Sequence, residues 1–126
     1  MEQSLYEQIG GEETLQKLVE AFYPRVYAHP DLKPIFQEDM QIIMHKQKLL
    51  LTQFLGGPPV YRETYGPPDL RRRHSPFEIT PKRAKAWLEC MKEAMDEIGL
   101  EGPLRELFYS RLTQVAYRMV NTEDPS

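Results

Sequence analysis

Cysteine is almost absent from this chain of 126 residues, which contains only Cys90. An internal disulfide and a zinc site built from several cysteines are therefore both excluded. No apolar run approaches the roughly 18 residues of a membrane-spanning helix. The first residues, 1–7, also lack the basic start and the apolar centre of a secretion signal. These absences predict a cytoplasmic protein that does not bind membranes.

The chain also lacks a surplus of positive charge, because 16 Lys and Arg residues face 19 Asp and Glu residues and leave a net charge of −3. Proteins that bind nucleic acids usually need a basic face, so that function is not expected. A chain of this length buries about two-thirds of its unfolded surface. We expect one domain over residues 1–126, with polar, irregular ends at residues 1–10 and 121–126.

Four stretches carry apolar residues at steps of three and four, the spacing of an amphipathic helix. No stretch alternates apolar and polar residues as a half-buried strand does. The sequence therefore predicts an all-α fold class. The helices are expected to begin after Gly10-Gly11, near Asp39, at Thr80-Pro81 and at Gly102-Pro103.

Residues 57–79 form an insert that holds five of the 11 prolines and shows no sustained helical period. A connection of this length inside a compact domain is usually functional or disordered. Tyr61, Leu70 and Phe77 make the insert too apolar for disorder. Since no strands are predicted elsewhere, we expect something other than a sheet to pack against these side chains.

The centre of the insert reads Leu-Arg-Arg-Arg-His-Ser-Pro-Phe, residues 70–77. A neutral imidazole is a common metal ligand, and guanidinium groups match the two oxygens of a carboxylate. His74 beside this cationic cluster suits a haem, whose iron takes a nitrogen ligand and whose porphyrin carries two propionates. The alternative is a solvated basic loop with an incidental histidine, and the stretch on its own fits that alternative better.

Three polar side chains, those of Tyr23, Gln47 and Trp87, fall on helix stripes that are otherwise apolar. A buried polar group is costly unless it is hydrogen-bonded, so each of them either bonds a nearby backbone group or faces a ligand. Trp87 taken alone is typical of a plain core residue. Together with His74, the three residues favour a polar ligand pocket.

Several short motifs also occur in an order and spacing that are specific as a set. They are Gly10-Gly11, Phe22-Tyr23, Pro34-Ile35-Phe36, Lys46-Gln47 with Gly56-Gly57-Pro58-Pro59, Arg73-His74 and Ala86-Trp87-Leu88. With these motifs the chain resembles a truncated haemoglobin of the second group over nearly its full length. The resemblance implies two antiparallel helix pairs packed two-over-two around one haem b, with the insert on the proximal side.

The resemblance also implies a role for each matching residue. His74 corresponds to the proximal ligand of the iron. Ile43 stands where many globins place a distal histidine, and it joins Tyr23, Gln47 and Trp87 in the distal pocket. The residues expected to bind the haem are Phe36, Lys46, Leu50, Tyr61, Leu70, Arg73, His74 and Phe77. Within this set Lys46, Tyr61 and Arg73 are expected to meet the propionates.

The function implied is binding of oxygen, or of nitric oxide or carbon monoxide, at a five-coordinate ferrous haem. Several donors around the gas would slow its release, which argues against bulk oxygen transport. One alternative is a haem-dependent redox enzyme, a nitric oxide dioxygenase or a peroxidase-like protein, with a reductase as partner. Another is an interaction module without haem, in which His74 lies on the surface. The chain is expected to be a monomer or a weak homodimer.

Overall fold

A computed structural model describes residues 3–36, 38–67 and 78–124 of the chain. Within these ranges every regular element is a helix and no strand occurs, so the prediction of an all-α fold is confirmed. The elements are α1 (Leu5–Gln8), α2 (Gly11–Ala28), the short 3₁₀ helix η1 (Lys33–Ile35), α3 (Met40–Phe54), α4 (Val60–Tyr65), α6 (Pro81–Glu97) and α7 (Pro103–Arg118). No described helix is both long and apolar enough to cross a membrane.

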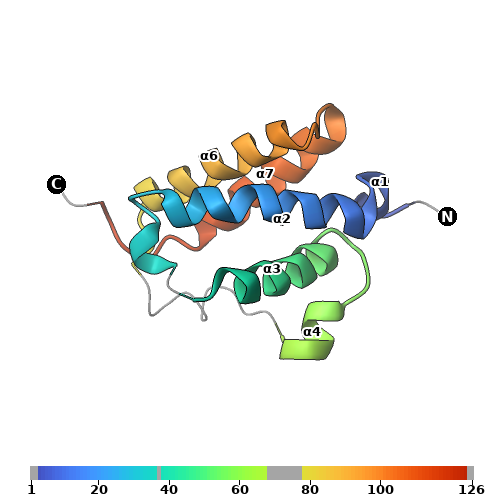
Figure 1. The fold of residues 1–126 in the computed structure, drawn as a ribbon, viewed down its shortest axis with the longest axis horizontal. Coiled ribbons are helices and arrows are strands. Elements are labelled where there is room, and N and C mark those ends of the chain that lie inside the picture. Colours follow the sequence, from blue (N-terminus) through green and yellow to red (C-terminus); the bar gives the residue numbers. More distant parts are fainter. Residues whose placement is uncertain (1–2, 37, 68–77, 125–126) are drawn as a thin grey trace.

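The four long helices form two antiparallel pairs, α2 with α3 and α6 with α7 (Figure 1). Helix α2 joins the two pairs, because it packs against its partner α3 on one side and against α6 of the other pair on the other side. The short helix α4 contacts α3. The predicted two-over-two arrangement is therefore the observed one.

The starts of α3 and α6 follow from their capping residues. The carboxylate of Asp39 accepts a hydrogen bond from the backbone N–H of Gln41 at 2.9 Å, and the hydroxyl of Thr80 accepts one from the N–H of Arg83 at 3.1 Å. Each bond satisfies a donor that has no partner inside its helix. Pro81 then occupies the first turn of α6, where its missing N–H costs nothing.

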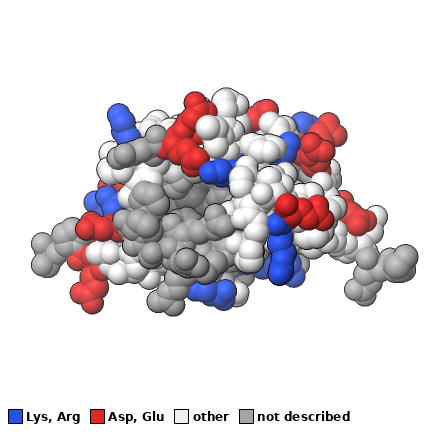
Figure 2. Space-filling model, turned by 90° about the horizontal axis from the view of Figure 1, so that it is seen from below, with Lys and Arg blue, Asp and Glu red and all other residues white. Residues whose placement is uncertain are grey.

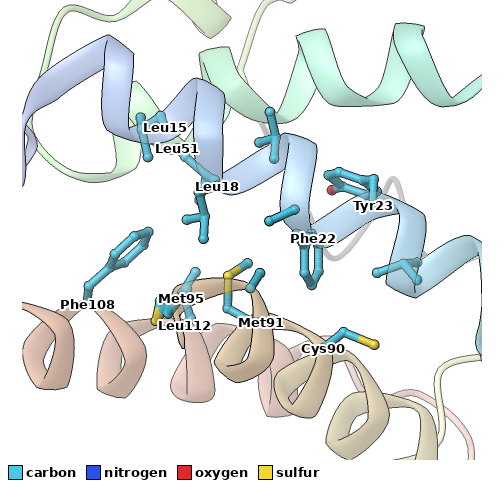
Figure 3. Packing of buried hydrophobic residues seen from close by; sticks show 14 of the residues in the cluster. Leu15, Leu18, Phe22, Tyr23, Leu51, Cys90, Met91, Met95, Phe108 and Leu112 are labelled. Carbon is cyan, nitrogen blue, oxygen red and sulfur yellow. The ribbon is translucent and has the colours of Figure 1, made fainter. Parts of the chain in front are cut away.

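The core lies where α2 meets α6 and α7. Leu15, Leu18 and Phe22 of α2 are almost fully buried, as are Met91 and Met95 of α6. Phe22 points from α2 towards α6, whereas Tyr23 lies on the side of α2 that faces α3 (Figure 3). Burying an apolar side chain of this size stabilises a fold by about 1.5–3 kcal/mol, so this contact holds the two pairs together.

The N-terminal residues are more ordered than the sequence indicates. Leu5 and Ile9 are buried, and the N–H of Tyr6 donates to the carbonyl oxygen of Leu55 at 3.0 Å. A Cβ atom added at Gly57 would lie 2.8 Å from the ring of Tyr6, so only glycine allows this approach. The expectation of an irregular start was wrong for residues 5–8, because α1 packs against α2 and α7 and bonds Leu55, the residue that follows α3.

The C-terminal residues 121–124 lie against the start of α6. The side-chain oxygen of Asn121 accepts a hydrogen bond from the N–H of Ile79 at 2.9 Å, and the carboxylate of Asp124 accepts one from the N–H of Lys82 at 3.2 Å. Residues 121–124 form no helix or strand, and these two bonds attach them to the start of α6.

The insert also contains a helix that its composition did not reveal. Helix α4 covers only six residues, too few for a 3.6-residue period to appear. Tyr61 is buried in it, and the rings of Tyr61 and Tyr65 lie 5.2 Å apart. The expected lack of helical structure across residues 57–79 was therefore wrong for α4.

Candidate functional site

A mainly apolar cavity lies between α3 on one side and α6 and α7 on the other, with residues of η1 at one end. It contains about 940 Å³ of empty space, including the part that opens to solvent. Pockets for small molecules and cofactors commonly have this apolar character. The lining residues are Leu32, Ile35, Phe36, Ile43, Gln47, Leu50, Leu51, Phe54, Ile79, Arg83, Ala84, Trp87, Leu112, Val115, Ala116 and Met119.

Five of the residues predicted from the sequence line this cavity together. Ile43, Gln47 and Leu50 come from α3, where steps of four and three place them on one face of the helix. Phe36 follows η1, and Trp87 reaches the cavity from α6. Gln47, the polar residue on the otherwise apolar stripe of α3, thus faces the cavity.

Tyr23 lies behind this lining and is 1% exposed. Its ring meets that of Phe22 edge to face at 4.7 Å and lies 6.4 Å from the ring of Phe36. Its hydroxyl is buried, and no partner for it exists among the described residues. Burial raises the pKa of Tyr23 far above the usual range, and the nearby side chain of Gln47 lowers this pKa in part. The Gln47 amide nevertheless does not meet the geometry of a hydrogen bond to the Tyr23 hydroxyl.

Phe22 connects Tyr23 to Trp87, a link that helical spacing alone did not indicate. The Phe22 ring also meets the Trp87 ring edge to face, at 5.1 Å. Edge-to-face pairs of this kind contribute about 0.5–1.5 kcal/mol beyond simple burial. One side chain of the core therefore fixes the rings of both candidate donors, which the sequence interpretation had placed only among apolar neighbours.

The opposite wall of the cavity was missed by the sequence analysis. It consists of Leu112 and Val115 from α7 and Met119 directly after α7, with Ile79 and Arg83 near the start of α6. Leu112, Val115 and Met119 follow the helical spacing expected of a buried stripe, but spacing cannot distinguish a stripe that faces a cavity from one that faces other helices.

Two predicted residues, Lys46 and Tyr61, do not line the cavity. The ammonium group of Lys46 lies 2.9 Å from the carboxylate of Glu38 and 5.6 Å from the centre of the Tyr65 ring. The hydrogen bond to Glu38 raises the pKa of Lys46. Tyr61 is buried in α4. Lys46 of α3 is therefore held by Glu38 and Tyr65, and Tyr61 packs on Tyr65 within α4.

The remaining predicted residues, Leu70, Arg73, His74 and Phe77, lie outside the described residues. In the ranges that are described, no three His, Cys, Asp or Glu side chains come together to hold a metal ion. Acidic and basic side chains are interspersed on the face seen from below α3 and α4, with no large patch of one sign among the residues described there (Figure 2).

The buried hydroxyl of Tyr23 should make stability depend on alkaline pH. The group ionises near 10.0 in the unfolded chain and only at higher pH in the folded one. The free energy of unfolding is therefore independent of this proton below pH 10 and falls as the pH rises above 10, by about 1.4 kcal/mol per pH unit for one proton. Urea unfolding between pH 8 and 11 should show a shallower decline in Tyr23→Phe than in the native protein. Equal slopes would mean that the hydroxyl reaches solvent.

Known proteins share this fold and sequence. Residues 4–121 match the family model described as bacterial-like globin. A group 2 truncated hemoglobin of Bacillus subtilis is 58% identical over 116 residues, which are 92% of this chain and 87% of that protein. The crystal structure of the group II truncated hemoglobin from Bacillus anthracis superposes with a TM-score of 0.97 at 51% identity, covering 100% of this chain and 97% of that one.

Among solved structures, the chain is also similar to the X-ray structure of a truncated oxygen-avid haemoglobin from Bacillus subtilis. It has a TM-score of 0.91 at 56% identity and covers 94% of this chain and 100% of its own. Sequence and structure thus agree over almost the whole length of the chain. The protein belongs to the bacterial-like globins and, within them, to the group II truncated haemoglobins.

Proposed function

We propose that this protein binds haem b in the cavity between α3, α6 and α7, and that it uses this haem to bind molecular oxygen and other diatomic gases. Membership of the globin family implies haem. The observation that carries the proposal for oxygen is the hydroxyl of Tyr23, which is buried next to the cavity without a partner in the described chain.

The cavity fits such a cofactor in its chemistry. Its wall is apolar where a porphyrin face would lie, with Phe36, Leu50 and Phe54 among the lining residues. A buried hydroxyl without a hydrogen bond costs about 1–3 kcal/mol. Natural proteins keep such an unpaired buried group mainly at functional sites. The Tyr23 hydroxyl is therefore an argument that a ligand binds here and accepts its hydrogen bond.

Each residue has a defined task in this proposal. A haem held by one imidazole supplies an open coordination position for a diatomic gas. His74 provides that imidazole, and Arg73 offers a cation to the propionates, whereas Lys46 is already paired with Glu38 beside the cavity. Tyr23 stays protonated because burial raises its pKa, so it can donate a hydrogen bond to a gas ligand that carries partial negative charge. Trp87 offers its indole N–H from the other side of Phe22.

The relatives support oxygen as the ligand. The Bacillus subtilis haemoglobin that shares 56% of its residues with this chain is described as oxygen-avid. Slow release of a bound gas would follow from its polar neighbours, since Gln47 and Trp87 line the cavity and Tyr23 is buried beside Phe22 and Phe36.

An absorption spectrum tests the proposal directly. The purified chain, supplemented with hemin, should show a Soret band, and a pyridine haemochrome should identify the haem as type b. After reduction without oxygen the spectrum should be that of a five-coordinate ferrous haem. Admission of oxygen should change it reversibly. A chain that takes up no hemin, or a reduced spectrum that oxygen leaves unchanged, would contradict the proposal.

A further inference from the structure

The tail of the chain satisfies both backbone groups of a residue on the cavity wall. Ile79 lines the cavity, is 8% exposed and belongs to no helix. Its N–H donates to the side-chain oxygen of Asn121 at 2.9 Å. Its carbonyl oxygen accepts from the N–H of Asn121 at 2.9 Å and from that of Thr122 at 3.2 Å. Two tail residues thus hold one wall residue from outside.

The same junction is tied by two further side chains. The carboxylate of Asp124 accepts a hydrogen bond from the N–H of Lys82 in the first turn of α6 at 3.2 Å. The guanidinium of Arg83 donates to the carbonyl oxygens of Asp31 at 3.0 Å and of Glu78 at 2.6 Å. The start of α6 is therefore hydrogen-bonded to Asp31, which precedes η1, and to the C-terminal residues Asn121 and Asp124 through the backbone of Ile79 and Lys82.

Ile79 depends on the tail because it has no regular partner of its own. An unpaired backbone N–H or C=O group beside an apolar cavity costs free energy. Residues within a helix find partners for these groups in the same helix, whereas Ile79 lies outside any helix and needs partners from elsewhere in the chain. Met119, two residues before Asn121, lines the cavity as well. The chain thus runs directly from one wall residue to the anchor of another.

We propose that Asn121 is a positioning residue for the cavity: by holding the backbone of Ile79 it keeps that side chain against the cofactor and slows cofactor loss. The proposal rests on the proposed function, because it takes haem to be what the cavity holds. Asn121 itself does not line the cavity, so it acts through Ile79.

Three variants separate this role from a general effect on stability. Asn121→Ala removes the oxygen that accepts from Ile79, whereas Asn121→Asp keeps an acceptor at that place. Tyr109→Phe is the matched control, because it removes one hydrogen bond between a side chain and the backbone, from the Tyr109 hydroxyl to the Leu88 carbonyl at 3.2 Å, and neither residue lines the cavity. The first measurement is the rate of haem transfer to excess apomyoglobin.

Asn121→Ala should speed haem transfer roughly three- to ten-fold, the effect of losing one hydrogen bond. Asn121→Asp and Tyr109→Phe should stay within about two-fold of the native rate on the same basis. An unchanged rate in Asn121→Ala would overturn the proposal, and so would an equal acceleration by Asn121→Asp or by Tyr109→Phe.

A second measurement needs no cofactor. Hydrogen exchange of the Ile79 amide in the haem-free chain should be faster in Asn121→Ala than in Asn121→Asp, because only the alanine variant frees this N–H. If the native chain takes up no hemin, the proposed function fails, while faster Ile79 exchange in Asn121→Ala still supports the anchor. Unchanged Ile79 exchange would overturn the anchor whether or not hemin binds.

Discussion

Replacing His74 by Ala should abolish stable haem retention. No described histidine can take its place: His45 is exposed on α3, and the Nδ1 atom of half-buried His29 accepts a hydrogen bond from the N–H of Asp31 at 3.1 Å. Neither histidine lines the cavity. The ratio of Soret absorbance to protein absorbance after gel filtration should therefore fall to near zero in His74→Ala and stay at the native value in His45→Ala.

A complementing experiment separates loss of the ligand from loss of the fold. His74→Gly leaves space for a free imidazole, so added imidazole should restore a five-coordinate ferrous spectrum to this variant. Far-ultraviolet circular dichroism of the haem-free variant should match that of the haem-free native chain. If His74→Ala instead keeps one haem per chain with an unchanged ferrous spectrum, the iron has another ligand and the assignment of His74 is wrong.

The second large effect is expected at Tyr23 and Trp87. Tyr23→Phe removes only a hydroxyl, so the edge-to-face contact with Phe22 should survive. Trp87→Phe removes the indole N–H but also leaves a void, which costs some stability. If each group donates to the gas ligand, either change should raise the oxygen off-rate by roughly five- to a hundred-fold, from about 1–3 kcal/mol per donor.

Carbon monoxide provides the internal control for these variants. Its outer atom carries much less negative charge than that of oxygen in the same position, so a lost donor should change its off-rate far less. General loosening of the pocket would accelerate the release of both gases alike. Stopped-flow displacement of both gases from each single variant decides between these outcomes. Equal effects on the two gases would show that Tyr23 and Trp87 are only core aromatics.

The double variant tests whether the two donors act on one ligand. Groups that share a partner are coupled, so the effect of Tyr23→Phe with Trp87→Phe should differ from the sum of the single effects. Simple additivity on the logarithm of the oxygen off-rate would mean that the two side chains act independently, with Phe22 between them as an inert spacer.

The sequence predicts the four long helices because each is long enough for its apolar period to repeat. The same spacing places Ile43, Gln47 and Leu50 on one face of α3, and the structure brings that face to the cavity. Helices α1 and α4 escaped prediction because four and six residues hold too little of a period to be recognised. Short elements are set by tertiary contacts, such as the approach of Tyr6 to Gly57.

Side-chain partners across the fold were the other part that periodicity could not supply. The sequence assigned Lys46 to an anionic cofactor edge, and in the structure its ammonium group pairs with Glu38, eight residues earlier in the chain. Asn121 and Ile79 lie 42 positions apart and meet only because α6 and α7 form an antiparallel pair. Such contacts depend on how the helices pack, which no local pattern encodes.

The unpaired hydroxyl of Tyr23 has a consequence for attempts to engineer this protein. Substitutions are commonly ranked by the stability of the chain on its own, and by that measure Tyr23→Phe would rank high, because it removes a buried polar group without a partner in the described chain and keeps the ring. Selection for thermal robustness of the empty protein would therefore erase the best-buried donor of the cavity region. Stabilising designs should hold Tyr23 fixed and draw their gains from exposed positions such as Ile42 or Tyr117.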